Sequence, residues 1–268
     1  MDRDLTHLSL FSGIGGLDLA AELAGFYTVG QCEWADYPRA VLEKHWPGLP
    51  RWRDIRTLTK ESFFEQTGLH TVDVISGGFP CQPFSVAGKH GGKEDDRYLW
   101  PEMLRVIREL QPTWVVGENV PGIVNLALDE VLASLEEEGY EVQCFLVPAC
   151  GVDAPHRRER CVIVAYSTKI RLQTPRPEQQ TAWAARESKN VSDSESWWKQ
   201  RKFSSWIETW RSCGCGWWSA EPDVGRVANG VPNRVDRLKC LGNAVVPQQF
   251  YPFFAAIAKI ERQEKSYE

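Results

Sequence analysis

The chain begins with a strand, a glycine-rich turn and a helix, and this order restricts the fold more than any other feature of the sequence. Residues 5–11 form a short β-prone run that ends in the turn Ser12-Gly13-Ile14-Gly15-Gly16. The apolar residues that follow recur at helical spacing, namely Leu17, Leu19, Ala20 and Leu23. Such a turn lets a ligand approach the backbone and points free N–H groups of the helix start at an anion. The same turn also occurs as a purely structural link, so alone it is weak evidence for function.

A second strand, residues 27–32, ends in Glu33-Trp34. Glu33 lies 20 residues after Gly13, the placement at which an acidic side chain meets ribose hydroxyls in nucleotide-binding βαβ units. Trp34 could lie against an adenine ring. The turn carries no phosphate-binding lysine, which argues against a P-loop nucleotide hydrolase.

A cysteine follows the next buried strand in an unusually stiff setting. Residues 72–75 form a short, mostly apolar run, Gly77 and Gly78 then allow a tight turn, and Cys81 stands between Pro80 and Pro83. The thiol is therefore expected at the carboxyl end of a strand, where open α/β sheets place their chemistry. A buried packing cysteine is the alternative, but packing alone does not require such rigid flanks. The polar, glycine-containing run 86–97 is typical either of a lid or of a disordered surface loop.

The middle of the chain continues the alternation of strands and helices. The pattern predicts helices over residues 100–110 and 126–138, and strands over residues 113–117, 140–147 and 161–165. Glu118 and Asn119 end the strand 113–117, so the carboxylate could face the same crevice as Cys81. A surface glutamate after a strand is the ordinary alternative. A last amphipathic helix is predicted over residues 250–260.

Two arginines precede the strand 161–165. Arg158 and Arg160 alternate with Glu159 at strand spacing, which predicts that both lie on one face. Two guanidinium groups on one face suit a base edge or a phosphate. A solvated basic edge is the competing interpretation.

Residues 166–225 break this alternation and hold seven of the 12 tryptophans, too many aromatic residues for a disordered linker. Charge is also uneven: residues 151–240 hold 16 basic and 10 acidic side chains, although the whole chain has a net charge of −5. Basic and aromatic residues together suit contact with nucleic acid, while tryptophan is more often a core residue.

Length and composition suit a soluble globular protein: 268 residues, 43% hydrophobic and 25% charged. The N-terminal residues lack the apolar core of a signal peptide, and no apolar stretch is long enough to span a bilayer. We therefore expect a cytoplasmic protein with reduced cysteines. The spacing of the eight cysteines gives no two-pair zinc pattern, and we expect no metal site.

Several motifs together resemble those of the DNA (cytosine-5)-methyltransferase family. Residues 77–85, Gly-Gly-Phe-Pro-Cys-Gln-Pro-Phe-Ser, resemble its catalytic motif, and residues 11–16 resemble its S-adenosylmethionine-binding motif. Residues 226–237 and 241–247 resemble its closing motifs. The resemblance keeps the family's order from Leu8 to about Ile257 and leaves residues 166–225 uncovered.

The resemblance implies an α/β fold: a Rossmann-like S-adenosylmethionine-dependent methyltransferase domain with a mostly parallel sheet, plus a small irregular target-recognition domain. The implied domains are residues 1–165 for catalysis and cofactor binding, 166–238 for target recognition, and 239–268 returning to the catalytic domain. The residues implied to bind S-adenosylmethionine are Phe11, Ser12, Gly13, Ile14, Gly15, Gly16, Glu33, Trp34, Asp54, Ile55, Pro80, Leu99, Asn243 and Ala244.

By the same resemblance, the thiolate of Cys81 attacks carbon 6 of a flipped-out cytosine, Glu118 donates to N3, and Arg160 holds O2 with support from Arg158. The residues implied to contact DNA are Gln82, Ser85, Lys89 and Arg97. His156 stands where the family has glutamine and is given no role. The products are 5-methylcytosine and S-adenosylhomocysteine.

The expected partner is double-stranded DNA, and the chain is expected to be a monomer that does not bind membranes. A cognate restriction enzyme is the further partner that the resemblance allows. Two other functions stay open: an RNA cytosine-5 methyltransferase, and an inactive DNA-binding relative. The Cys-Phe-Thr sequence that marks the RNA-modifying branch is absent here, and the intact Cys81, Glu118 and Arg160 speak against the inactive relative.

Overall fold

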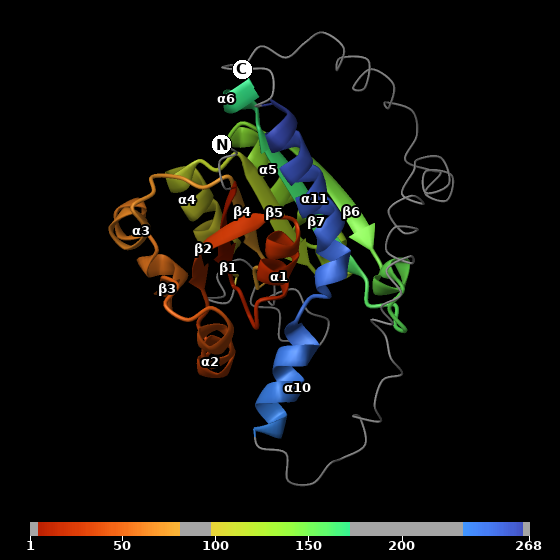
Figure 1. Ribbon diagram of the computed structural model, residues 1–268. Helices are drawn as coiled ribbons and strands as arrows, with labels where there is room; N and C mark the ends of the chain where they lie inside the picture. Colours follow the sequence, from red (N-terminus) through yellow and green to blue (C-terminus); the bar gives the residue numbers. More distant parts are fainter. Residues whose placement is uncertain (1–4, 81–97, 172–232, 265–268) are drawn as a thin grey trace, which may run out of the picture.

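The computed structural model describes residues 5–80, 98–171 and 233–264. Within them, the strands form a seven-stranded sheet in the order β3-β2-β1-β4-β5-β7-β6 (Figure 1). The strands are β1 (Leu5–Leu10), β2 (Phe26–Cys32), β3 (Arg51–Trp52), β4 (Val74–Gly77), β5 (Trp114–Asn119), β6 (Tyr140–Val147) and β7 (Arg160–Ser167).

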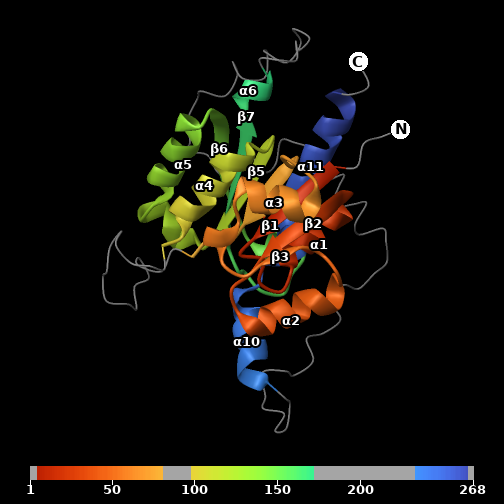
Figure 2. The ribbon, with the colours of Figure 1, turned by 90° about the vertical axis from the view of Figure 1, so that its left-hand side faces the viewer.

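Helices cover both faces of this sheet. The α-helices are α1 (Gly16–Leu23), α2 (Asp36–His45), α3 (Lys60–Thr67), α4 (Trp100–Leu110), α5 (Leu128–Glu137), α6 (Thr168–Arg171), α10 (Arg234–Asn243) and α11 (Pro247–Glu264). Short 3-10 helices are η1 (Ile55–Thr57), η4 (Pro121–Asn125) and η5 (Ala149–Val152). Figure 2 shows α4 and α5 on one side of the sheet and α1 and α11 on the other. None of the helices in the described ranges is long and apolar enough to cross a membrane.

The strand directions bring several strand ends to one edge of the sheet. β1 pairs in parallel with β2 and β4, β2 with β3, and β4 with β5, whereas β7 runs antiparallel to β5 and β6. From β1 the chain first builds β2 and β3 on one side and then crosses to β4 on the other. Ligands of open α/β sheets bind outside the carboxyl ends of the strands at such a reversal. The start of antiparallel β7 lies at the same edge, because Cys161, next to Arg160, pairs with Asn119 at the end of β5.

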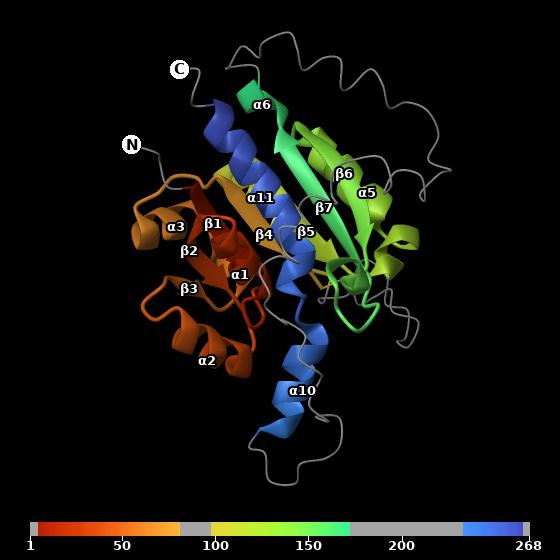
Figure 3. The same cartoon turned by 45° about the vertical axis from the view of Figure 1, so that its right-hand side comes forward.

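Each face of the sheet has its own hydrophobic core. On one face, Ile75 and Val115 pack with Trp100, Met103 and Ile107 of α4. The helix α4 forms because its apolar residues recur at helical spacing, and it ends where Gln111 adopts a left-handed backbone before Pro112. On the other face, α1 and the long α11 pack against β1, β4 and β5 around residues such as Phe250 and Phe254. Figure 3 shows α11 beside α1, with α10 extending beyond the end of the sheet.

The predicted fold class, an α/β fold with a mostly parallel sheet, is confirmed. The predicted strands lie within two residues of the observed ones. Three boundaries differ from the prediction. Phe11 lies outside β1 with a positive φ of 52°, α5 begins at Leu128 and not at residue 126, and the last helix runs over Pro247–Glu264 and not over residues 250–260. The predicted target-recognition segment lies almost wholly outside the described residues.

Candidate active site

The first glycine turn is tied to the end of β2 by Glu33. The Gly13 N–H donates to Glu33 Oε2 over 2.8 Å, and the Ala35 N–H donates to Oε1 over 2.9 Å. Ser12 is buried, and its hydroxyl donates to the carbonyls of Ser9 and Cys32. The turn and the acidic side chain at the next strand end therefore form one unit.

The three glycines of this turn serve different purposes. A Cβ on Gly13 would meet no atom within 4 Å, so the backbone there faces open space. A Cβ on Gly15 would lie 2.5 Å from the Trp46 ring, and one on Gly16 would lie 2.7 Å from a methyl of Val245. Both Gly13 and Gly15 have positive φ, which disfavours other residues. Ile14 is half-buried between them.

The ends of β2 and β3 form the outer side of the site. The Trp34 side chain is 63% exposed, and the Arg53 guanidinium lies 5.7 Å from the centroid of its ring. Asp54 caps η1 by accepting from the Arg56 N–H, whereas Ile55 is buried in the core. Of the predicted pair, the structure thus leaves Asp54 half-buried and places Ile55 inside the core.

The closing segment lies beside the first turn. Asn243 is the last residue of α10, and Ala244 follows as its C-cap. Val245 packs on Gly16, so residues far apart in the sequence meet here. Burial raises the pKa of the Cys240 thiol, and the nearby negative charge of Glu33 raises it further. The end of α10 therefore lies near Glu33 and the glycine turn.

The strand that leads to Cys81 ends at the same edge of the sheet. Cys81, Gln82, Ser85, Lys89 and Arg97 lie outside the described residues. The parts of the chain before and after that segment are joined by a hydrogen bond, in which the Leu99 N–H donates to the Pro80 carbonyl over 3.4 Å. The Asn119 side chain donates to the Phe79 carbonyl over 3.0 Å. The end of β4 is thus fixed to the end of β5 immediately before Cys81.

Glu118 and Arg160 form a buried ion pair beside this strand end. Arg160 Nε lies 2.8 Å from Glu118 Oε1. Burial raises the pKa of Glu118 to about 7, although the positive charges of Arg160 and Arg158 act to lower it. The other carboxylate oxygen lies against Gly78, where a Cβ would come within 2.5 Å of it. A carboxyl with a pKa near neutrality can donate or accept a proton at the pH of a cell.

Arg158 does not lie on the strand face predicted for it. β7 begins at Arg160, and Arg158 precedes it with a positive φ of 30°. Its Nη2 donates to the Gly242 carbonyl over 2.7 Å and also contacts the Ala244 carbonyl. The irregular backbone explains the error, since strand alternation cannot be extended past the end of a strand. Arg158 instead binds the closing segment, a contact that the sequence pattern alone did not indicate.

A comparison with known families decides where the chain belongs. Residues 5–212 match the family model described as C-5 cytosine-specific DNA methylase. The chain is a member of the C-5 cytosine-specific DNA methylase family. The first glycine turn and the Glu118-Asn119 pair both lie within the matched residues, and both lie at one edge of the sheet.

Among the relatives of this chain is the type II methyltransferase M.PspPI of Psychrobacter sp., 36% identical over 186 residues. The match covers 65% of this chain and 44% of the relative. The type II methyltransferase M.HgiCII of Herpetosiphon aurantiacus is 32% identical over 173 residues, which cover 63% of this chain and 38% of the relative. The chain thus spans less than half the length of these two relatives.

A solved structure has the same fold. It is a prophage-encoded protein of E. coli, described as a DNA modification methyltransferase, with a TM-score of 0.54 and 26% sequence identity. The superposed region covers 65% of this chain and 49% of the E. coli chain. The similarity supports the methyltransferase fold of the sheet and its helices.

Proposed function

We propose that this methylase transfers a methyl group from S-adenosylmethionine to carbon 5 of cytosine in double-stranded DNA, acting as a monomer. The observation that carries the proposal is the buried Glu118–Arg160 pair beside Gly78, three residues before Cys81. It places an acid with a pKa of about 7 next to the strand end that leads to the nucleophile. Membership of the cytosine-5 family supports the same substrate atom.

The first turn has the chemistry that an adenosine-containing cofactor requires. Gly13 faces open space, the Glu33 carboxylate can accept from ribose hydroxyls, and the exposed Trp34 ring offers a flat surface for adenine. In the proposed complex Asn243 and Ala244 border the pocket from the closing segment. S-adenosylmethionine would supply the methyl group from its positively charged sulfur. The rest of the cofactor would be left as S-adenosylhomocysteine, in which the sulfur is neutral.

The protein must activate the cytosine, because carbon 5 is a poor nucleophile. The Cys81 thiolate adds to carbon 6, forming a C–S bond and moving electron density toward carbon 5 and N3. Neutral Glu118 donates its proton toward N3, and Arg160 stabilises charge on O2. After methylation, loss of the carbon 5 proton re-forms the double bond as the C–S bond breaks. Carbon 6 is inaccessible inside a duplex, so the base must first leave the stack.

Contact with DNA is assigned to two parts of the chain, most of which lie outside the described residues. Gln82, Ser85, Lys89 and Arg97 follow the nucleophile, and residues 166–238 are proposed to select the target sequence. RNA is the alternative substrate, and it is disfavoured by the missing Cys-Phe-Thr sequence.

The proposal is tested with duplex DNA that carries 5-fluorocytosine. Fluorine on carbon 5 cannot leave as a proton, so the reaction should stop with the protein joined to DNA through Cys81. We expect a denaturation-stable adduct that requires S-adenosylmethionine and is absent from Cys81→Ala. Incorporation of labelled methyl into unmodified duplex, with a matched RNA as control, measures turnover. An adduct that persists in Cys81→Ala, or methylation of the RNA alone, would overturn the proposal.

A further inference from the structure

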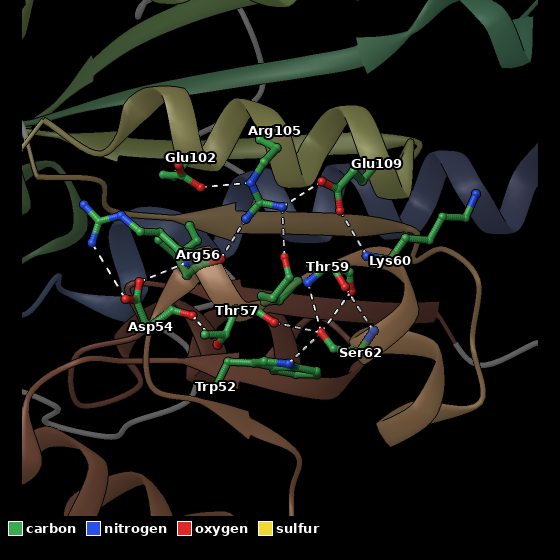
Figure 4. Close-up of polar contacts among 12 residues, drawn as sticks. Trp52, Asp54, Arg56, Thr57, Thr59, Lys60, Ser62, Glu102, Arg105 and Glu109 are labelled. Atoms are coloured by element: carbon green, nitrogen blue, oxygen red, sulfur yellow. Dashed lines mark hydrogen bonds and ion pairs between the residues drawn. The ribbon is translucent and has the colours of Figure 1, made fainter.

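Arg105 on α4 holds the backbone of the segment that follows β3 (Figure 4). Its Nη2 donates to the Ile55 carbonyl over 2.8 Å, and its Nη1 donates to the Leu58 carbonyl over 3.1 Å. Both carbonyls lie in or beside η1, the single turn that begins after Asp54. One side chain of a core helix therefore fixes two peptide groups of this short turn.

The guanidinium is itself held in place by two carboxylates on the same helix. Arg105 Nε donates to Glu102 over 2.9 Å, and Nη1 donates to Glu109 over 2.8 Å. All three side chains are about one-quarter to one-third exposed, at 27–30%. Glu109 also accepts from the Lys60 N–H over 3.0 Å, at the first turn of α3. Arg105 and Glu109 thus form hydrogen bonds with both ends of the segment 55–60.

The segment also forms hydrogen bonds with Asp54 and Ser62, which lie close to it along the chain. The Thr57 hydroxyl donates to the Asp54 carbonyl, and Ser62 Oγ donates to the Thr57 carbonyl. The buried side chains of Ile55 and Leu58 anchor one side in the core. The two hydrogen bonds from Arg105 can fix how the backbone is rotated about these buried side chains. A planar guanidinium suits this task because its donors have a rigid, forked arrangement.

The position of this turn matters because it lies beside the end of β2. The Glu33 N–H donates to the Trp52 carbonyl over 3.1 Å, and Arg53, next to Asp54, lies over the Trp34 ring. In nucleotide-binding sheets the acidic residue after the second strand takes the ribose, so the base extends outward past it. Here that direction leads toward the ends of β2 and β3, where Trp34 and the Asp54 turn lie.

We propose that Arg105 is a positioning residue for the adenine end of the cofactor pocket. It contacts no cofactor and acts through the Ile55 and Leu58 carbonyls, which set the placement of Asp54 and Arg53. This inference rests on the proposed function, because it assumes that S-adenosylmethionine occupies the site.

The test compares Arg105→Gln with Arg108→Gln on the same helix. Arg108 is a matched control, since it is also an ion-paired arginine on α4 but reaches Glu138 and not the turn. For Arg105→Gln we expect KM for S-adenosylmethionine to rise about five- to tenfold through lost preorganisation, with kcat within about twofold. Calorimetric affinity for S-adenosylhomocysteine should fall by the same factor. The affinity for methylthioadenosine, which lacks the amino-acid end of the cofactor, should also fall by this factor.

Arg105→Lys keeps the positive charge but loses the forked arrangement of donors. It keeps the test informative if the glutamine variant does not fold. We expect it to bind S-adenosylhomocysteine with an intermediate affinity and to melt near wild type. If both Arg105 variants fold and bind like Arg108→Gln, the inference is wrong while the proposed function stands. If the wild type shows no measurable binding of S-adenosylmethionine or its analogues, both fall together.

Discussion

At the residue scale, Glu118 carries a specific expectation about pH. Its pKa is raised to about 7, mainly by burial, so the neutral acid is the main form below pH 7 and is lost above it. If this acid donates to N3, kcat/KM of the wild type should fall as pH rises through about 7. Cys81 acts in the opposite direction, because its reactive thiolate accumulates as pH rises.

Glu118→Gln separates these two groups. An amide can still donate to N3 but cannot transfer a proton, so we expect a loss of turnover on the order of a hundredfold. The remaining activity should no longer decline on the alkaline side. S-adenosylhomocysteine affinity, measured by calorimetry, should stay near wild type because Glu118 contacts Arg160 and Gly78 rather than the glycine turn. An alkaline decline that survives the substitution would assign it to another group.

At the scale of elements, the site depends on how closely β4 and β5 approach at their carboxyl ends. Gly78→Ala would place a Cβ 2.5 Å from Glu118 Oε2, and the buried carboxylate would have to leave its place beside Arg160. We expect turnover to fall at least tenfold, a cost of about 1.4 kcal/mol, with cofactor affinity retained. Gly122→Ala is the control, since its Cβ would approach an atom no closer than 4.0 Å. Equal turnover in the two variants would contradict this account of the strand ends.

The same strand ends show what the sequence could and could not predict. Buried strands such as β4 and β5 are continuous apolar runs closed by glycine or polar residues, so periodicity locates them and places Glu118 at an end. β3 has only two residues, and α2 buries only Leu42 among its members, so neither has a pattern to detect. Contacts such as Gly16 with Val245 join distant parts of the chain. They follow from tertiary packing, which local patterns do not contain.

At the scale of the whole molecule, the two faces of the sheet differ in chemistry. The face under α4 and α5 is apolar, whereas the face under α1 and α11 holds a buried polar layer. His7 contacts the hydroxyls of Thr28 and Ser76, and burial lowers its pKa to about 3. Asp18 accepts from Ser9 over 2.8 Å and from Gln31 over 2.7 Å, and burial raises its pKa to about 6. Titration of this layer links stability to pH.

The two groups act in opposite directions. An unfolded chain protonates His7 below about pH 6.5, while the folded protein does so only near pH 3, so stability from this group is lost as pH falls through that range. For Asp18 the folded protein keeps a proton up to about pH 6, whereas the ordinary pKa is 3.8. Stability from Asp18 is therefore full below pH 3.8 and is lost as pH rises toward 6.

Asp18→Asn should isolate the second contribution. The amide can accept from Gln31 and donate to Ser9, so the fold should survive, but no proton is released between pH 4 and 6. As pH rises over that interval, the free energy of unfolding of the wild type should fall relative to that of the variant, by about 1 kcal/mol per pH unit. Urea denaturation at several pH values measures this difference.

Asp129→Asn is the matched control, because Asp129 also lies in the first turn of a helix but is exposed. Its profile of stability against pH should run parallel to that of the wild type. Parallel profiles for Asp18→Asn as well would mean that Asp18 remains ionised in the folded protein, with the polar layer compensating for its burial.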